Sequence, residues 1–179
     1  MSEKSDILLQ ECRDGILVLT LNRPEARNAL NTELLTRLKE ALRAADDDAE
    51  AKVVVLTGTG NTFCAGADLK ESKANLEGAD FWTRYARANQ SLDLHRLLPK
   101  LATPVIAAVN GYAVAGGCGI AMSCDLVIAD AEAKFGYPEV KRGLVAAMVM
   151  VSLSRIVGKR QAMDLLLTGR LVGPDEARN

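Results

Sequence analysis

Two clusters of small residues stand where the sequence could hold a ligand against backbone N–H groups. The segment FCAGADLKE (63–71) follows the apolar run VVVLTG, and AGGCG (115–119) follows the apolar run PVIAAVNG. Glycine and alanine let a ligand approach the backbone, and the first N–H groups of a helix have no partner inside that helix. If the two clusters lie side by side, the N–H groups of Ala67 and Gly116 could donate to one oxygen. Each donor of such an oxyanion hole is typically worth about a hundredfold or more in rate.

The elements that would position these clusters alternate between strands and helices. Apolar and β-rich runs predict strands at residues 7–12, 16–21, 53–57, 104–111 and 125–130, the first two joined by a hairpin turn at Gly15. Helical spacing of apolar residues predicts helices at 33–45, from near Ala67, at 76–98, at 120–123 and at about 144–157. This recurrence indicates an α/β fold in which the two clusters could be neighbours.

Composition and charge are typical of a soluble globular protein. The chain has 179 residues, 49% of them hydrophobic and 25% charged, with a net charge of −1, which suits one domain with a sizeable core. There is no basic field for nucleic acid and no apolar run of membrane-spanning length. The N-terminus has no apolar leader, and the cysteines show no C-x-x-C spacing. We therefore expect free thiols and a reducing, cytoplasmic compartment.

Four motifs, in this order, resemble those of the enoyl-CoA hydratase/isomerase family, also called the crotonase family. They are NRPEARNALN (22–31), FCAGADLKE (63–71), NGYAVAGGCGIAMSCDLVIA (110–129) and FGYPEVKRGL (135–144). The resemblance runs from about Asp6 to the last residue. It implies a single crotonase-like domain over residues 1–179, built as a spiral of ββα units.

The same resemblance implies an acyl-CoA substrate. The N–H groups of Ala67 and Gly116 would hold the thioester oxygen, and coenzyme A would be part of the substrate, with no separate cofactor. The substrate-binding positions that it implies are Ala26, Ala29, Ala65, Ala67, Asp68, Leu69, Lys70, Gly116 and Gly117.

Glu139 is the acid that the resemblance assigns to catalysis. Hydratases of the family carry two glutamates; the second corresponds to Glu139, but the first position holds Gly119 in this sequence. Adding water is easiest with two carboxyl groups, whereas moving a double bond between C3 and C2 needs only one base. We therefore rank isomerisation slightly above hydration, and we expect no side chain in the place of the missing acid.

Two alternatives stay open. The first is a 2-enoyl-CoA hydratase that uses Glu139 alone or together with Asp68, Glu71 or an acid of the 76–80 loop. The second is a non-catalytic acyl-CoA-binding homologue, which Gly119 favours and the intact pair of N–H donors disfavours.

Structural roles are expected for the other conspicuous residues. Asp68 should cap the helix that follows it. His95, the only histidine, stands among leucines at helical spacing and has no nucleophile to serve. Cys64 and Cys118 have no neighbouring base and are expected to be small apolar fillers. The segment GTGNTF (58–63) lacks both the third glycine of a dinucleotide fingerprint and a Walker lysine, so we expect no nucleotide cofactor and no metal.

The C-terminal segment bears on assembly. Relatives normally continue for several helices after the segment that matches GRLVGPDEA (169–177), and those helices cover the acyl pocket and build trimers or hexamers. We therefore expect a C-terminally short domain without the usual C-terminal helices. Its homotrimer or hexamer should be weakened, with an exposed apolar surface near 162–172.

Overall fold

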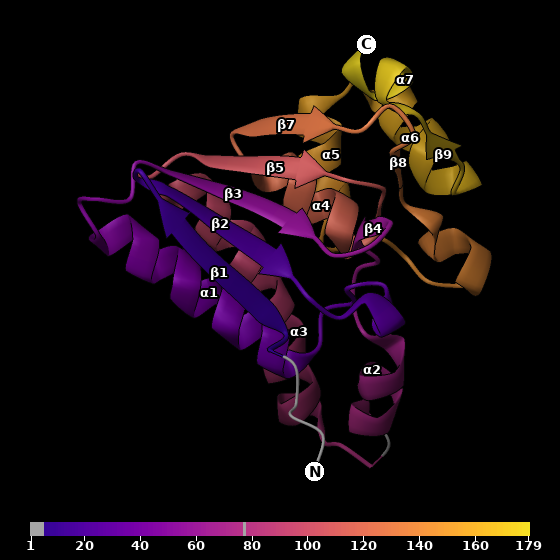
Figure 1. Cartoon of the computed structure of the whole chain (residues 1–179). Helices are drawn as coiled ribbons and strands as arrows, with labels where there is room; N and C mark the ends of the chain where they lie inside the picture. The colour runs from indigo at the N-terminus through magenta and orange to yellow at the C-terminus, as the bar shows by residue number, and fades with distance from the viewer. Residues whose placement is uncertain (1–5, 77) are drawn as a thin grey trace.

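The computed structural model describes residues 6–76 and 78–179, which form two sheets with helices packed around them (Figure 1). The larger sheet has the strand order β1-β2-β3-β5-β7. β1 and β2 are antiparallel and joined by the predicted turn, where Gly15 has a φ of 80°; the other neighbours are parallel. The strands are β1 (Leu8–Arg13), β2 (Ile16–Leu21), β3 (Val53–Gly58), β5 (Val105–Val109) and β7 (Leu126–Ala129). All five predicted strands are confirmed to within two residues.

A smaller sheet was not predicted, because its strands are too short to show an apolar alternation. Its order is β4-β6-β8-β9, with β4, β6 and β8 parallel and β9 antiparallel to β8. The strands are β4 (Thr62–Cys64), β6 (Tyr112–Val114), β8 (Lys134–Gly136) and β9 (Leu171–Val172). The expected strand at 104–111 in fact ends in a turn before β6. A Cβ on Gly111 would lie 2.1 Å from the backbone oxygen of Asn61, so this turn requires glycine.

The first unit gives β1 and β2 to the larger sheet and then α1, and each later turn of the chain gives one strand to each sheet and then one or more helices, which is the expected spiral of ββα units. α2 and α3 follow β4, α4 follows β6, and η3 and α5 follow β8. The α-helices are α1 (Thr32–Asp47), α2 (Leu69–Leu76), α3 (Phe81–Leu97), α4 (Gly116–Ser123), α5 (Met150–Ile156), α6 (Lys159–Thr168) and α7 (Pro174–Arg178). The 3-10 helices are η1 (Pro24–Ala26), η2 (Leu98–Lys100) and η3 (Pro138–Arg142).

Helix α1 forms as its sequence predicts. The side-chain oxygen of Asn31 accepts from the N–H of Leu34 at 2.9 Å and so caps the first turn. The leucines and alanines at helical spacing are buried, and α1 packs against β1, β2 and α3. Helix α1 thus covers the larger sheet, whereas the two small-residue clusters emerge from β4 and β6 of the smaller sheet (Figure 1).

Three helix predictions need correction. The expected helix at 120–123 is α4, which already begins at Gly116. The expected helix at 76–98 is α3, which begins only at Phe81, where the carboxylate of Asp80 accepts from the N–H of Thr83 at 2.7 Å. The expected helix at 144–157 is limited to α5, because residues 144–146 are irregular and residues 147–149 form a turn before it. That shortening matters for the site, since these six residues all line its cavity.

Apolar side chains are exposed near the C-terminal end, as expected. Met163 is 46% exposed and Leu167 is 65% exposed, although Ala162 and Val172 are buried. A second exposed apolar group lies on β7, at the edge of the larger sheet, where Leu126 and Ile128 are 61% and 64% exposed. The effect of these surfaces on assembly stays a prediction.

Candidate active site

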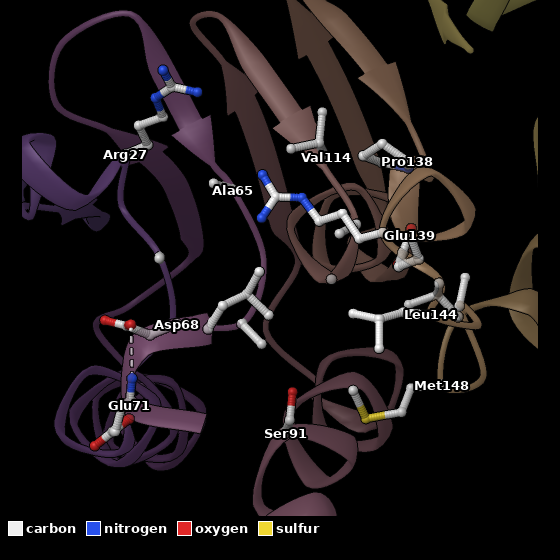
Figure 2. A pocket seen from close by; sticks show the side chains of 18 of the residues that line it. Arg27, Ala65, Asp68, Glu71, Ser91, Val114, Pro138, Glu139, Leu144 and Met148 are labelled. Carbon is white, nitrogen blue, oxygen red and sulfur yellow. Dashed lines mark hydrogen bonds between the residues drawn. The ribbon is translucent and has the colours of Figure 1, made fainter. Parts of the chain in front are cut away.

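A cavity of about 880 Å³ lies between the two small-residue clusters and η3. Figure 2 shows Arg27, Ala65 and Asp68 on one side of it and Pro138, Glu139 and Leu144 on the other. The cavity has a mixed lining: backbone and small residues at the two clusters, charged groups at η1, α2 and η3, and apolar side chains along 144–149.

The first cluster runs from β4 into α2. Gly66 adopts a φ of 84°, and its oxygen accepts from the N–H of Leu30 at 2.8 Å. The N–H of Asp68 then donates to the oxygen of Leu30 at 3.0 Å. These two bonds form a β-bridge opposite Ala67 and leave its own N–H unused within the described part of the chain.

The second cluster runs from β6 into α4. Ala115 has φ 54° and ψ −129°, a conformation that alanine rarely adopts, and its N–H donates to the oxygen of Gly136 at 2.9 Å. Gly116 is the first residue of α4, so its N–H has no carbonyl partner one turn earlier in the helix.

The two clusters meet, as the proposed donor pair requires. A Cβ built on Gly66 would lie 2.9 Å from the N of Gly116, and one built on Gly116 would lie 4.0 Å from the N of Ala67. The contact arises because β4 and β6 are parallel neighbours, so the segments after them emerge at the same edge of the sheet. Two unpaired N–H groups therefore stand close together at the cavity.

Glu139 lines the opposite wall and is half-buried. Its Oε2 is buried and has no hydrogen-bond partner among the described residues. Burial raises the pKa of this carboxyl group above its ordinary value, against the lowering effect of a hydrogen bond with its own backbone. A carboxyl group with a raised pKa and an unused oxygen is suited to accept and return a proton.

The place of the missing acid is not empty, so the expectation of an open spot at Gly119 was wrong. A Cβ on Gly119 would lie 2.3 Å from Cγ1 of Val149 and 2.9 Å from Cε1 of His95. Both neighbours are buried, and Val149 also lines the cavity. A side chain at position 119 would therefore have to displace Val149.

His95 has the structural position that was expected. Burial lowers the pKa of its imidazole, opposed by a hydrogen bond with the backbone of Gly119, so the ring is held in its neutral form. It packs behind α4 and does not belong to the cavity lining.

The other candidate acids are engaged elsewhere. The Asp68 carboxylate lies 3.0 Å from the Arg23 guanidinium, and it accepts from the N–H groups of Lys70 and Glu71 at 3.1 and 3.2 Å. These bonds confirm its capping role. Glu71 lines the cavity, but its carboxylate accepts from the N–H of Thr32 at 2.9 Å. Of the acids in the 76–80 loop, Asp80 caps α3, and Glu77 lies outside the described residues.

Most positions that the resemblance implied for substrate binding line the cavity. They are Ala26, Ala29, Ala65, Ala67, Asp68, Leu69, Lys70 and Gly116. Gly117 does not line it: this residue is buried against β4, where a Cβ would lie 2.1 Å from the oxygen of Cys64. Sequence reasoning missed Ser91 and most of the wall at 144–149, which lie outside the four motifs, and it assigned no role to Arg142, although this residue lies within the motif at 135–144.

The cysteines have the state that the sequence analysis expects. Burial raises the pKa of the Cys64 thiol to about 12 and that of Cys118 to about 11, so neither forms a thiolate at neutral pH. The four cysteines are free. Among the described residues, no cluster of histidine, cysteine and acidic side chains could hold a metal ion, and no helix is long and apolar enough to cross a membrane.

The comparisons with known proteins identify the family of this chain. Residues 11–179 match the model of the enoyl-CoA hydratase/isomerase family, and the chain belongs to that family. A Thermus thermophilus relative is 47% identical over 174 residues, which cover 96% of this chain and 67% of the relative. The short-chain-enoyl-CoA hydratase of Clostridium acetobutylicum is 40% identical over 179 residues, covering 98% of this chain and 66% of that enzyme.

Solved structures give the same fold. The crystal structure of an enoyl-CoA hydratase from Mycobacterium smegmatis has a TM-score of 0.91 at 37% identity, with 97% of this chain and 67% of that chain covered. The chain thus spans about two thirds of the length of the relatives that it matches.

Proposed function

We propose that this chain acts on an acyl-CoA thioester and moves a double bond between C3 and C2. The N–H groups of Ala67 and Gly116 bind the thioester oxygen and stabilise the enolate. Glu139 removes a proton from C2 and returns it to C4. Coenzyme A is part of the substrate, and no resident cofactor takes part.

One observation carries the preference for isomerisation. Among the described acids of the cavity lining, Glu139 alone has a buried carboxylate oxygen without a hydrogen-bond partner, and the side chains of Val149 and His95 fill the place at Gly119 where a second carboxyl would stand. A proton shuttle needs one such group, whereas positioning a water for addition is easier with two.

Glu139→Gln tests this assignment. The amide keeps the shape of the carboxylate but cannot act as a base, so isomerisation of 3-hexenoyl-CoA should fall by about a hundredfold or more. Binding of the unreactive hexanoyl-CoA should change little. The matched control is Glu71→Gln, which alters another carboxylate of the cavity lining that already has a backbone partner, and it should change turnover far less.

The pH dependence of the reaction gives a second readout on Glu139. Because its pKa is raised from 4.5, kcat/KM should increase with pH through a value above 4.5 and then level off as the carboxylate forms. A kcat/KM that does not change with pH through the values above 4.5 would show that Glu139 is not the base.

Hydration of 2-enoyl-CoA by Glu139, alone or with another acid, is the second candidate. The names of the relatives favour it, since the Clostridium acetobutylicum protein is a short-chain-enoyl-CoA hydratase. Strong hydration of 2-hexenoyl-CoA by the unmodified protein, lost in Glu139→Gln, would establish it. Binding of hexanoyl-CoA without turnover of either enoyl-CoA would instead identify a non-catalytic homologue.

The filled space at Gly119 provides a stricter test. Gly119→Glu alone should destabilise the fold, because its Cβ meets Val149. Combined with Val149→Ala, the new carboxyl group gains room and should introduce or raise hydration. An increase in hydration from Gly119→Glu alone, without loss of stability, would show that Val149 does not control this space.

A further inference from the structure

Arg142 is a cation of the cavity that the proposed reaction does not use. Of the arginines that line the cavity, Arg23 is paired with Asp68, whereas Arg27 and Arg142 have no acidic partner within residues 6–76 and 78–179. Arg27 lies near η1, beside positions implied to contact coenzyme A. Arg142 belongs to η3, the element that carries Glu139.

The geometry of η3 directs Arg142 toward the same space as Glu139. In a 3-10 helix the side chains of residues i and i+3 lie on the same side, separated by about 6 Å along the axis. Glu139 and Arg142 have this spacing, and both line the cavity. No ion pair joins them, and no cation contributes to the pKa of Glu139. The Arg142 guanidinium is therefore free to bind a charge supplied by a ligand.

The surroundings of Arg142 indicate which charge that is. The chain continues from it into the apolar wall at 144–149, with Leu144 and Val149 in the cavity lining. This wall, together with Glu139, lies on the opposite side of the cavity from Arg27 and Asp68 (Figure 2). A guanidinium at the border of an apolar wall forms no hydrogen bond or ion pair with a plain alkyl chain, but it can bind a carboxylate through two parallel hydrogen bonds.

We propose that Arg142 binds the terminal carboxylate of a short dicarboxylic acyl group, so that the preferred substrates are ω-carboxyenoyl-CoA thioesters. This inference rests on the proposed function, because the reacting carbons are placed at Glu139. The short, apolar part of the acyl chain lies along 144–149, and its far carboxylate meets the guanidinium.

Two substrates of equal chain length test the proposal. 3-Hexenedioyl-CoA and 3-hexenoyl-CoA differ in the terminal carboxylate, and kcat/KM should be about tenfold or more higher for the first, since a hydrogen bond between charged groups contributes that much. Arg142→Gln should remove this preference. Arg142→Lys should restore part of it. The matched control is Lys141→Gln, which deletes a cation of the same 3-10 helix that does not line the cavity, and it should leave the preference intact.

Binding measurements separate this proposal from the proposed function. Equilibrium binding of adipoyl-CoA and hexanoyl-CoA needs no turnover, and the adipoyl ester should bind about tenfold more tightly to the unmodified protein but not to Arg142→Gln. Tighter binding of adipoyl-CoA with no isomerisation would retain the role of Arg142 and reject the reaction. Equal binding of the two esters would overturn the proposal. Equal weakening of both esters, and of free coenzyme A, by Arg142→Gln would overturn it too and assign Arg142 to the phosphates of coenzyme A.

Discussion

The two small-residue clusters that carry the proposed N–H donors are held in place by different forces. At the first cluster, between β4 and α2, polar side chains from the 23–28 segment fix the backbone. Asp68 pairs with Arg23, with side chains only 13% and 15% exposed. The amide of the buried Asn28 donates to the oxygens of Thr59 and Thr62 at 3.0 and 2.6 Å. This cluster depends on charge and hydrogen bonding.

The second cluster, between β6 and α4, is held by backbone contacts and close packing. Gly117 stands against the oxygen of Cys64, and Ala115 keeps a left-handed backbone conformation between a strand and a helix. No ion pair involves this segment within the described residues. The position of the Ala67 N–H should therefore be sensitive to charge substitutions and to salt, whereas the position of the Gly116 N–H should be sensitive to side-chain volume.

Gly117→Ala should have the largest effect. Its Cβ would lie 2.1 Å from one backbone oxygen and 2.7 Å from the adjoining carbonyl carbon of Cys64, so β4 and α4 would have to separate. We expect a loss of about 3 kcal/mol or more in the free energy of unfolding. The matched control is Gly116→Ala, whose Cβ would meet nothing closer than 3.6 Å. Denaturant unfolding of both variants measures the difference; equal stability would show that packing does not hold this cluster.

Gly116→Pro should distinguish the effect of the Gly116 N–H on turnover from the effect of packing on stability. Proline is tolerated at the first position of a helix but has no N–H, so turnover should fall by about a hundredfold or more while the fold survives. Steady-state kinetics and circular dichroism measure the two effects. Gly116→Ala keeps the N–H, so an equally large loss in that variant would assign the effect to crowding instead of to the missing donor.

Asp68→Asn should lower the free energy of unfolding by about 1–3 kcal/mol, because it weakens the contacts of the first cluster. The amide oxygen can still cap α2, but Arg23 loses its counter-charge. Burial alone would raise the pKa of Asp68, yet the N–H of Glu71 and the Arg23 guanidinium together hold it below 3.8. The stability that the native protein has over Asp68→Asn should therefore be fully present above pH 3.8. It should be lost as the pH falls through the lower pKa of Asp68 in the folded state.

The control for Asp68→Asn is Glu33→Gln, which breaks an exposed pair with Arg37 and should cost less than about 0.5 kcal/mol. Thermal unfolding at low and high salt compares them, because salt should reduce an electrostatic contribution. A cost for Asp68→Asn no larger than the control's would mean that the first cluster does not depend on this charge.

Ala115→Gly should have the smallest effect and the opposite sign. Glycine adopts a φ of 54° without strain, which should gain about 1 kcal/mol after the greater chain entropy of unfolded glycine is subtracted. For a domain of this size that corresponds to a rise of about 2–4 °C in Tm. A decrease in Tm would show that contacts of the Ala115 methyl group outweigh the backbone strain.

The sequence predicts the larger sheet and the neighbourhood of the two small-residue clusters well, because both rest on local signals. Apolar or β-rich runs of four to six residues mark the strands of the larger sheet, and the small residues around Ala67 and Gly116 mark the proposed donors. The smaller sheet has strands of two or three residues, which no periodicity can reveal. Yet that sheet brings the two clusters together, so the sequence is compatible with their contact but does not by itself establish it.

The contents of the cavity were less predictable for a different reason. Gly119 led to the expectation of an open space where hydratases of the family carry a glutamate side chain. Val149 and His95, which lie far from Gly119 in the sequence, fill that space. Arg142 and Asn28 lie within two of the quoted motifs, but nothing in those motifs indicates what either side chain contacts. Arg142 acquires its position from a 3-10 helix that also holds Glu139, and the role of Asn28 depends on carbonyl groups more than 30 residues away in sequence.

The parallel pairing of β4 with β6 affects the distance between the two proposed donors. Neighbouring strands in any sheet lie about 4.7–4.9 Å apart. Ala67 follows the end of β4 by three residues and Gly116 follows the end of β6 by two. The spacing of these paired strands therefore sets how far apart the two segments begin, and the contacts of each cluster hold the proposed donors from there. The proposed oxyanion hole should thus keep its width on heating until the β4–β6 ladder itself breaks, and activity should be lost abruptly with that ladder.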